Sequence, residues 1–415
     1  MNAPTRPAPG PAFLLDVPTT FTTTWVERVA ALNREFAGTG RRVSQVYGAF
    51  QSSRFSSARP SKYLPRPTRE QFAQHVGALR AVGVGFNYLI NAPSYGNLEY
   101  TAAGRRELED ELAFLVDCGV QSVTLAIPFL VQIAAARFPQ LEIVVSTLGY
   151  VHSLRGLEQY RDAGARRIVI DVEANRDFGF LELAVRANLA EIELIVNPVC
   201  IYQCNFKHAH YCTAAHGSQS TGEPGNVGTP YNAYYLNWCF LEKLENVDEF
   251  LKSPWMRPED VPLWQGLGIK HFKVAGRGST EEHLECLARA YLAQRFEGNL
   301  LDLLGWPHWL SFRKTEDGRT LAPLEVRLEN RDLDGFMQFF YRNRPDCRLG
   351  CGDCNYCTDF GRGVVRVNDG GLLADYVTNM RAGLRAAVEH VPTEEEEVKE
   401  QARWRREAGK QAVEG

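Results

Sequence analysis

Short apolar runs rich in β-branched residues alternate with amphipathic segments over most of this chain. Seven runs between residues 43 and 275 are almost continuously apolar, as parallel strands buried on both faces require. They are Val43–Phe50, Gly85–Ala92, Ser122–Pro128, Glu142–Thr147, Arg167–Val172, Glu193–Pro198 and His271–Ala275. A weaker eighth strand is expected near Leu251–Met256.

Helical patterns fill the spaces between these runs. The clearest helical segments are Trp25–Phe36, Thr101–Cys118, Ser153–Gly164 and Thr280–Phe296. Ser153 and Ser279 stand where an N-cap is expected, and Gly119 and Gly164 stand where a helix ends. Strand and helix signals therefore alternate regularly along the chain.

This alternation predicts an α/β fold, a (β/α)8 TIM-like barrel that spans residues 40–300. A doubly wound open sheet is the alternative, but no G-x-G-x-x-G follows an early strand, which disfavours its dinucleotide-binding form. Residues 1–39 are expected to form a partly disordered N-terminal extension. Residues 301–390 are expected to form a small cysteine-rich C-terminal module, and residues 391–415 a charged tail.

The composition is that of a globular protein. Of 415 residues, 45% are hydrophobic and 23% are charged, which is enough apolar material for a large core. The formal net charge of -4 does not favour nucleic acid as a partner. No apolar run is long enough to span a membrane, and the N-terminus lacks a signal-peptide pattern, so we expect a cytoplasmic protein without membrane contact.

Cysteines give the strongest chemical signal. Eight of the ten fall into two groups. We call Cys200, Cys204, Cys212 and Cys239 the first cysteine set, and Cys347, Cys351, Cys354 and Cys357 the second cysteine set. In a reducing cytoplasm such density indicates metal binding and not disulfides. Cys118 and Cys286 lie in helical contexts and are interpreted as ordinary packing residues.

The first cysteine set begins directly after the strand that ends at Pro198, where a barrel carries its active site. Four thiolates suit zinc or an iron–sulfur cluster. The paired C-x2-C knuckles of structural zinc are absent, so a 4Fe–4S cluster is favoured. His208, His210 and His216 lie in the same loop. They are expected to be ligands, proton donors or substrate contacts or, alternatively, groups that hydrogen-bond to the loop and cover the cluster.

The second cysteine set packs four thiols into the sequence CRLGCGDCNYC. Its spacing indicates a second 4Fe–4S cluster of the ferredoxin type. A zinc knuckle and a radical S-adenosylmethionine motif are the alternatives. The second cluster would either relay electrons to the first or only staple a module that lacks a core of its own.

Three stretches resemble peptidase family U32, the collagenase-like iron–sulfur barrel proteins. They are the cysteine-bearing stretch IVNPVCIYQC, the later lone Cys239, and Lys273-Val-Ala-Gly-Arg277, which is similar to the family's K-I-E-G-R motif. The resemblance implies a barrel with an iron–sulfur loop and oxygen-independent hydroxylation. Ala275 stands where the family commonly carries glutamate, and the cysteine spacing also differs, so the chain is identified as a divergent member.

Polar residues at strand ends are the candidate catalytic groups. They are Asn91, Asp171, Lys273, Arg277 and, in the cysteine loop, His208. A Lys273–Arg277 pair would bind a carboxylate on the substrate. The alternative for Asp171 is a salt bridge with Arg277 or Lys273 that closes the barrel top.

The sequence therefore predicts an iron–sulfur oxidoreductase, most simply a hydroxylase of a small-molecule, peptide or RNA substrate, with two 4Fe–4S clusters. One alternative is a non-catalytic scaffold or electron-relay subunit in a hetero-oligomeric complex. The other is a protease, although the H-E-x-x-H and G-x-S-x-G motifs are absent. Expected partners are a small-molecule or peptide substrate and an electron donor.

Overall fold

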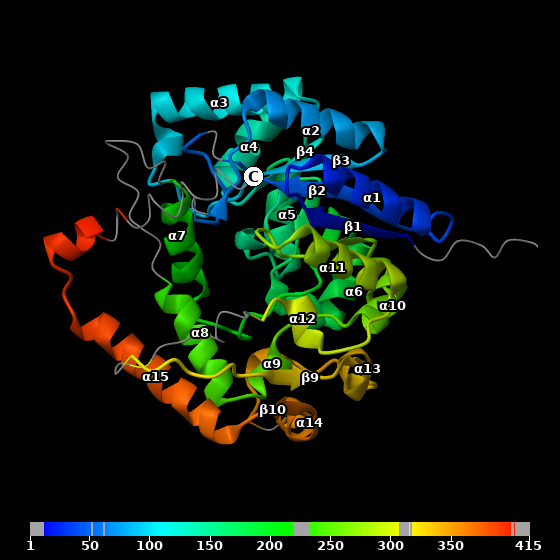
Figure 1. The fold of residues 1–415 in the computed structure, drawn as a ribbon. Coiled ribbons are helices and arrows are strands. Elements are labelled where there is room, and N and C mark those ends of the chain that lie inside the picture. The colour runs from blue at the N-terminus through cyan, green and yellow to red at the C-terminus, as the bar shows by residue number, and fades with distance from the viewer. Residues whose placement is uncertain are drawn as a thin grey trace, which may run out of the picture.

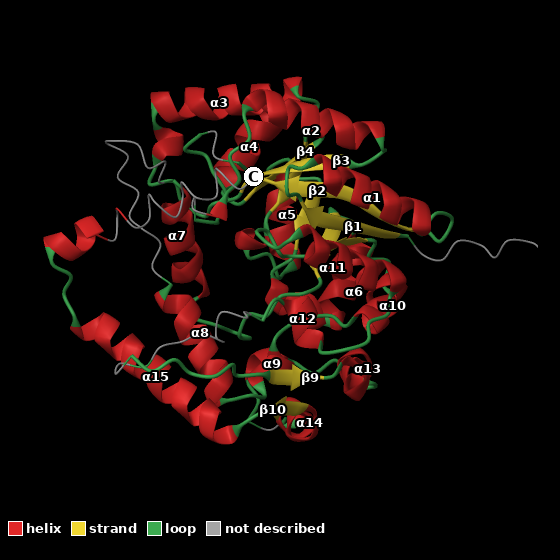
Figure 2. Ribbon diagram, in the orientation of Figure 1, coloured by secondary structure: helices red, strands yellow, loops and turns green. Residues whose placement is uncertain are grey.

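Eight parallel strands close into a barrel in chain order, with β1 next to β8 (Figures 1 and 2). The computed structural model describes residues 12–50, 53–60, 63–219, 233–306, 315, 318–352, 354–399 and 402. The strands are β1 (Phe13–Pro18), β2 (Arg41–Gly48), β3 (Gly85–Ile90), β4 (Ser122–Leu125), β5 (Glu142–Val145), β6 (Arg167–Val169), β7 (Glu191–Ile195) and β8 (His271–Lys273). The predicted (β/α)8 barrel is confirmed.

The barrel begins at Phe13 and not near residue 40. β1 pairs with β2 on one side and with β8 on the other. The prediction that residues 1–39 form an extension outside the barrel is therefore wrong for β1, which is a barrel strand. The strand predicted near Leu251–Met256 is also wrong, because α9 (Glu249–Lys252) begins there. The run at β1 is only six residues long and is interrupted by Asp16, so its apolar pattern is weak. Residues 1–11 lie outside the described part of the chain.

Helices surround the barrel and follow the predicted pattern closely. They are α1 (Thr23–Glu35), α2 (Arg69–Ala81), α3 (Ala102–Asp117), α4 (Pro128–Arg137), α5 (Leu154–Asp162), α6 (Phe178–Ala187) and α11 (Glu281–Ala293), with short 3-10 turns at Leu98–Tyr100, Thr147–Gly149 and Val172–Arg176. Ser153 caps α5 as predicted, whereas Thr280 caps α11 in place of Ser279 because its hydroxyl accepts the His283 N–H. Gly119 and Gly164 follow helix ends with φ of 82° and 104°.

The connection from β7 to β8 is long and carries the first cysteine set. It contains α7 (Lys207–Ser218), α8 (Tyr234–Glu245), α9, a 3-10 turn at Pro258–Asp260 and α10 (Val261–Gly266). After α11 come α12 (Leu300–Leu304), β9 (Val326–Leu328), α13 (Phe336–Asn343), α14 (Tyr356–Val364), β10 (Val365–Val367) and α15 (Gly370–Glu389), with 3-10 turns at Asn330–Leu333 and Cys347–Leu349. β9 and β10 pair antiparallel, and α15 packs along α8 (Figure 1).

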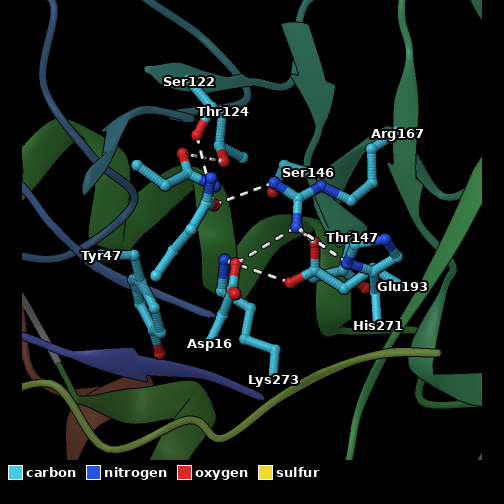
Figure 3. A network of polar contacts seen from close by, with 12 residues as sticks. Asp16, Tyr47, Ser122, Thr124, Ser146, Thr147, Arg167, Glu193, His271 and Lys273 are labelled. Carbon is cyan, nitrogen blue, oxygen red and sulfur yellow. Dashed lines mark hydrogen bonds and ion pairs between the residues drawn. The ribbon is translucent and has the colours of Figure 1, made fainter. Parts of the chain in front are cut away.

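Charged side chains fill part of the barrel interior (Figure 3). Arg167 is 2% exposed and lies 3.4 Å from Asp16 Oδ2 and 3.5 Å from Glu193 Oε2. Its guanidinium also donates to Gln45 Oε1 at 2.9 Å. This interior is therefore a network of opposite charges, and it lies beneath the strand ends where the candidate site is expected.

None of the helices in the described part of the chain is both long enough and apolar enough to cross a membrane.

Candidate functional site

A cavity of about 170 Å³ opens at the carboxyl ends of the barrel strands. Three cationic residues line it, Arg59, Lys273 and Arg277. Among the described residues, none that lines it carries a carboxylate. The uncharged lining includes Asn91, Thr124, Ser146, Thr147, Ala275 and Tyr211. This barrel cavity has the electrostatic character of an anion site.

Hydrogen bonds fix Asn91 and Arg277 at the cavity wall. Asn91 Oδ1 accepts the Ala58 N–H at 3.3 Å, and its Nδ2 donates to Ser146 Oγ at 3.1 Å. Arg277 Nη1 donates to Ser57 Oγ at 2.9 Å. Burial of the Arg277 guanidinium away from water lowers its pKa. Both side chains are thus held in place before any substrate enters.

Gly278 allows a second guanidinium to approach Arg277. Its φ is 87°, and a Cβ at this position would lie 2.6 Å from Arg59 Nη2. A side chain at this position would displace Arg59. The glycine that follows Arg277 therefore permits two arginines from distant parts of the chain to share one cavity.

Lys273 is one of the residues that line this cavity, and its side chain extends into the charged network of the barrel interior (Figure 3). Its Nζ lies 4.0 Å from the Tyr47 ring centroid and 3.7 Å from Glu193 Oε1, beyond hydrogen-bond distance. The side chain is nearly inaccessible to solvent, and no described residue accepts a hydrogen bond from Nζ. Burial lowers the pKa of Lys273, and the Glu193 carboxylate opposes that shift.

A second cavity of about 470 Å³ lies between the barrel and the C-terminal module. Lys207 on α7 lies 3.0 Å from Asp171 Oδ2 and 2.8 Å from Glu173 Oε1 in its wall. Burial opposes the charge on Lys207, but the two carboxylates raise its pKa. Next to this ion pair the His208 and Tyr150 rings lie 4.0 Å apart. We call this space the module cavity.

The five predicted catalytic residues divide between the two cavities. Asn91, Lys273 and Arg277 line the barrel cavity, whereas Asp171 and His208 line the module cavity. The alternative salt bridge of Asp171 with Arg277 or Lys273 is wrong, because Lys207 is its partner.

Sequence reasoning missed several groups that the fold brings to these cavities. They are Arg59 and Ser146 in the barrel cavity and Tyr150, Arg176 and Lys207 in the module cavity. Lys207 lies within the cysteine loop, and Ser146 lies at a strand end. The sequence could have indicated these two residues only through these positions along the chain. Arg59 belongs to a loop with no such signal.

The first cysteine set gathers beside the barrel top. Cys200 follows β7, Cys204 precedes α7, Cys212 lies in α7 and Cys239 lies in α8, all half-buried. Burial raises the pKa of Cys239 to about 11, and its thiol interacts electrostatically with Cys200 and Cys204. Tyr211, which lines the barrel cavity, interacts electrostatically with Cys200 and so links this set to that cavity.

The second cysteine set lies at the module cavity. Cys347, Cys351 and Cys357 line it, and Cys354 is exposed nearby. Burial raises the pKa of Cys357 to about 12, and its thiol interacts with the other three cysteines. The four thiols therefore share one neighbourhood.

The donor chemistry of both sets suits a thiolate-bound metal centre. In the conformation shown, no group of three or more His, Cys, Asp or Glu side chains in the described ranges is arranged to hold a metal ion. Metal binding by these cysteines therefore stays a prediction. The two loops do touch, since Gln203 Nε2 donates to the Arg348 carbonyl at 3.4 Å and each residue is next to a cysteine.

Comparison with known proteins agrees with the resemblance seen in the sequence. Residues 95–295 match the model of peptidase family U32. The chain is 28% identical over 305 residues to "Uncharacterized protease MJ1657" of Methanocaldococcus jannaschii, a match that covers 73% of this chain and 84% of that protein. The solved U32 peptidase Mk0906 is 18% identical with a TM-score of 0.46, over 64% of this chain and 94% of that one. Residues 95–295, which hold most of the barrel and the whole first cysteine set, are thus the part of the chain that is similar to peptidase family U32.

Proposed function

We propose that the protein is an iron–sulfur oxidoreductase that binds a 4Fe–4S cluster on each cysteine set and oxidises, most simply hydroxylates, an anionic substrate at the barrel cavity. The observation that carries the proposal is a pair of buried cations, Lys243 and Arg176. Each lies beside one cysteine set, and neither forms an ion pair with a carboxylate among the described residues. A buried cation is costly unless negative charge compensates it.

Lys243 belongs to the first cysteine set. It is fully buried, and its Nζ donates to Ser253 Oγ at 2.7 Å and to the Glu249 carbonyl at 3.3 Å, which are both neutral acceptors. Burial lowers its pKa, and the Cys239 thiol is the strongest opposing influence. Neutral thiols would leave this ammonium uncompensated. Four metal-bound thiolates would supply the missing negative charge.

Arg176 has the same relation to the second cysteine set. It is 9% exposed, donates to the Leu251 carbonyl at 2.6 Å and lies 4.7 Å from the Trp255 ring. Burial lowers its pKa to about 10, and the Cys357 and then the Cys347 thiols oppose that shift. Each cysteine set thus has thiols close to a buried cation.

The barrel cavity supplies binding and orientation. Arg277 and Arg59 would bind a carboxylate of the substrate, and the Asn91 amide would orient it by hydrogen bonds. A bound 4Fe–4S cluster supplies one-electron redox chemistry or Lewis-acid activation. Tyr211 lines the cavity and interacts electrostatically with Cys200, so the substrate would lie close to the first set. The Gln203–Arg348 contact supports electron relay from the second set.

Iron and acid-labile sulfide per chain, measured on anaerobically purified protein, test this proposal. Two clusters require about eight irons per chain. Cys200→Ser and Cys351→Ser should each remove about half of the iron, whereas the control Cys286→Ser, in α11 and outside both sets, should remove none. Zinc in place of iron, or unchanged iron in both variants, would contradict the proposal.

A protease is the second candidate, favoured by the names of the similar family and of the Methanocaldococcus jannaschii relative. The same variants separate the two functions. Peptide hydrolysis that persists in Cys200→Ser after loss of iron would support the protease. Dependence of substrate oxidation on that iron would support the oxidoreductase.

A further inference from the structure

We propose that the module cavity is a second ligand site, which binds an uncharged flavin through its flat isoalloxazine ring. The substrate of the proposed reaction lies in the barrel cavity, so the module cavity is a separate site. Its size, its aromatic lining and its charges favour such a ring whether or not the cysteines hold a metal.

The module cavity is large enough to enclose a small organic molecule. Its volume is about 470 Å³, whereas that of the barrel cavity is about 170 Å³. Sites that bury most of a small-molecule ligand have volumes of roughly 300–1,000 Å³. The wall is formed by residues that follow β5, β6 and α9, by the loop between Cys200 and Cys212, and by the C-terminal module. Of these two cavities, the module cavity is the one that can take a three-ring compound whole.

Aromatic side chains from separate segments line the module cavity. Tyr150 follows β5, Tyr202 precedes α7, and His208 lies in the first turn of α7. The Tyr150 and His208 ring centroids are 4.0 Å apart. Both tyrosines are half-buried and His208 is exposed, so part of their ring surface is open to a ligand. Flat aromatic ligands stack on such rings, and the lining therefore favours a planar ring over a flexible chain.

The charges of this lining favour a ligand without negative charge. Four cations line the cavity, and each already has acceptors among the described residues: Lys207, Lys252 and Arg348 in ion pairs, and Arg176 with backbone carbonyls. The Asp177 carboxylate accepts one backbone N–H at 2.9 Å, and no described cation lies within ion-pair distance of it. An anion would therefore find a poorer site here than in the barrel cavity, where cations face no described carboxylate.

Polar groups in the same wall suit the edge of a flavin ring. This edge carries one N–H donor between two carbonyl acceptors. The Asp177 carboxylate can accept from the N–H, and the Gln203 amide and the Tyr202 hydroxyl can donate to the carbonyls. The loops of both cysteine sets meet in this wall through the Gln203–Arg348 contact. A flavin exchanges electrons and a nucleoside does not, so the choice between these two flat heterocycles rests on the proposed function.

Riboflavin fluorescence, titrated with the full chain under anaerobic conditions, tests the inference. Stacking on tyrosine quenches flavin fluorescence, so saturable quenching is expected. Flavin mononucleotide, which adds a phosphate to the same ring system, should bind no more tightly than riboflavin. Tyr202→Ala and His208→Ala should each weaken binding about tenfold, the effect of one lost stacking contact. The control is Tyr100→Ala, which should bind as the wild type does, because Tyr100 is 63% exposed and lines neither cavity.

Absence of saturable quenching by the wild-type chain would overturn the inference, as would unchanged affinity in both Tyr202→Ala and His208→Ala. Displacement of riboflavin by an equal concentration of adenosine would overturn the choice of a flavin over a nucleoside. The wild-type titration needs no variant, and His208 is exposed, so its replacement does not disturb the core. Iron content tests the proposed function separately. Quenching by chain without iron would support this inference alone, and iron-loaded chain without quenching would overturn this inference alone.

Discussion

Lys207 joins the cysteine loop to the barrel, because its Nζ lies 3.0 Å from Asp171 Oδ2 with both side chains buried. Asp171 follows β6, and Lys207 begins α7, so the ion pair fixes the helix that carries Cys212 against the strand ends. The same ammonium donates to Glu173 at 2.8 Å. One lysine therefore neutralises two carboxylates at the wall of the module cavity.

Replacement of this lysine should destabilise the fold. Lys207→Met leaves Asp171 buried without its partner, and loss of one member of a buried ion pair costs about 3–5 kcal/mol. The free energy of unfolding from urea titration should fall by that amount. The control Lys270→Met removes an exposed pair with Glu191 and should cost about 1 kcal/mol or less. Equal losses of unfolding free energy in the two variants would show that the buried Lys207–Asp171 pair stabilises the fold no more than an exposed pair does.

Lys243 allows a test in which the sign of the effect changes with metal content. Without iron, Lys243→Met removes an uncompensated buried ammonium and should raise the free energy of unfolding by about 1–3 kcal/mol. With iron bound, it removes the cation that balances the thiolates and should speed iron loss to a chelator. Unfolding with and without iron, together with chelation rates, would measure both effects.

The control is Lys252→Met, in the neighbouring helix α9. Lys252 forms ion pairs with Asp248 and Glu249, so its loss should lower stability in both forms and leave the rate of iron loss unchanged. A stabilised Lys243→Met chain that retains iron as well as the wild type would contradict the compensation argument.

Much of the barrel was predictable because its strands are locally encoded. Seven of the apolar runs became strands, since a strand buried on both faces must be apolar throughout. β1 was missed because Asp16 interrupts its pattern, and the buried partner of Asp16, Arg167, comes from β6. A residue whose partner is 151 positions away leaves no local signal of its burial.

The site was predictable only in part for the same reason. Position at strand ends identified Asn91 and Arg277, but position does not specify partners. Lys207 reaches Asp171 because α7 turns back over the barrel, and Arg59 reaches the cavity because Gly278 leaves room for it. Such pairings depend on loop paths that periodicity does not encode.

Asp16 should make stability fall as the pH rises toward neutrality. Burial and then Glu193 raise the pKa of Asp16 from 3.8 to about 7, although Arg167 and Lys273 oppose them. Between these values the native chain keeps a proton that the unfolded chain releases, so the contribution is full below pH 3.8 and is lost as the pH passes 7. Each pH unit in this window changes stability by at most about 1.4 kcal/mol.

Asp16→Asn should flatten this part of the profile, because the amide has no proton to release and still faces Ser44. Urea unfolding at several pH values for both chains isolates the Asp16 contribution as their difference. Asp162→Asn, at an exposed position in α5, serves as the control and should follow the wild type. A wild-type profile parallel to that of Asp16→Asn would rule out a raised pKa at this carboxyl.

Arg176 should set the reduction potential of the second cysteine set, if that set binds iron as proposed. A reduced cluster carries one more negative charge than the oxidised form, so a buried cation beside Cys347 and Cys357 stabilises the reduced state. Arg176→Met should therefore lower the potential, and Arg176→Lys, which keeps the charge, should lower it less. A potentiometric titration followed by EPR in a Cys200→Ser background would report this cluster alone.

Two comparisons keep this test independent of general loss of structure. Arg176 also donates to the Leu251 and Trp255 carbonyls, so both variants should lose about 1–3 kcal/mol of stability through unpaired acceptors. Arg348→Met removes an exposed arginine next to Cys347 and should change the potential little, because solvent screens its charge. If Arg176→Met and Arg348→Met shifted the reduction potential equally, the prediction would be wrong. The buried Arg176 would then affect the potential no more than an exposed cation does, and its position beside the thiols would reflect packing alone.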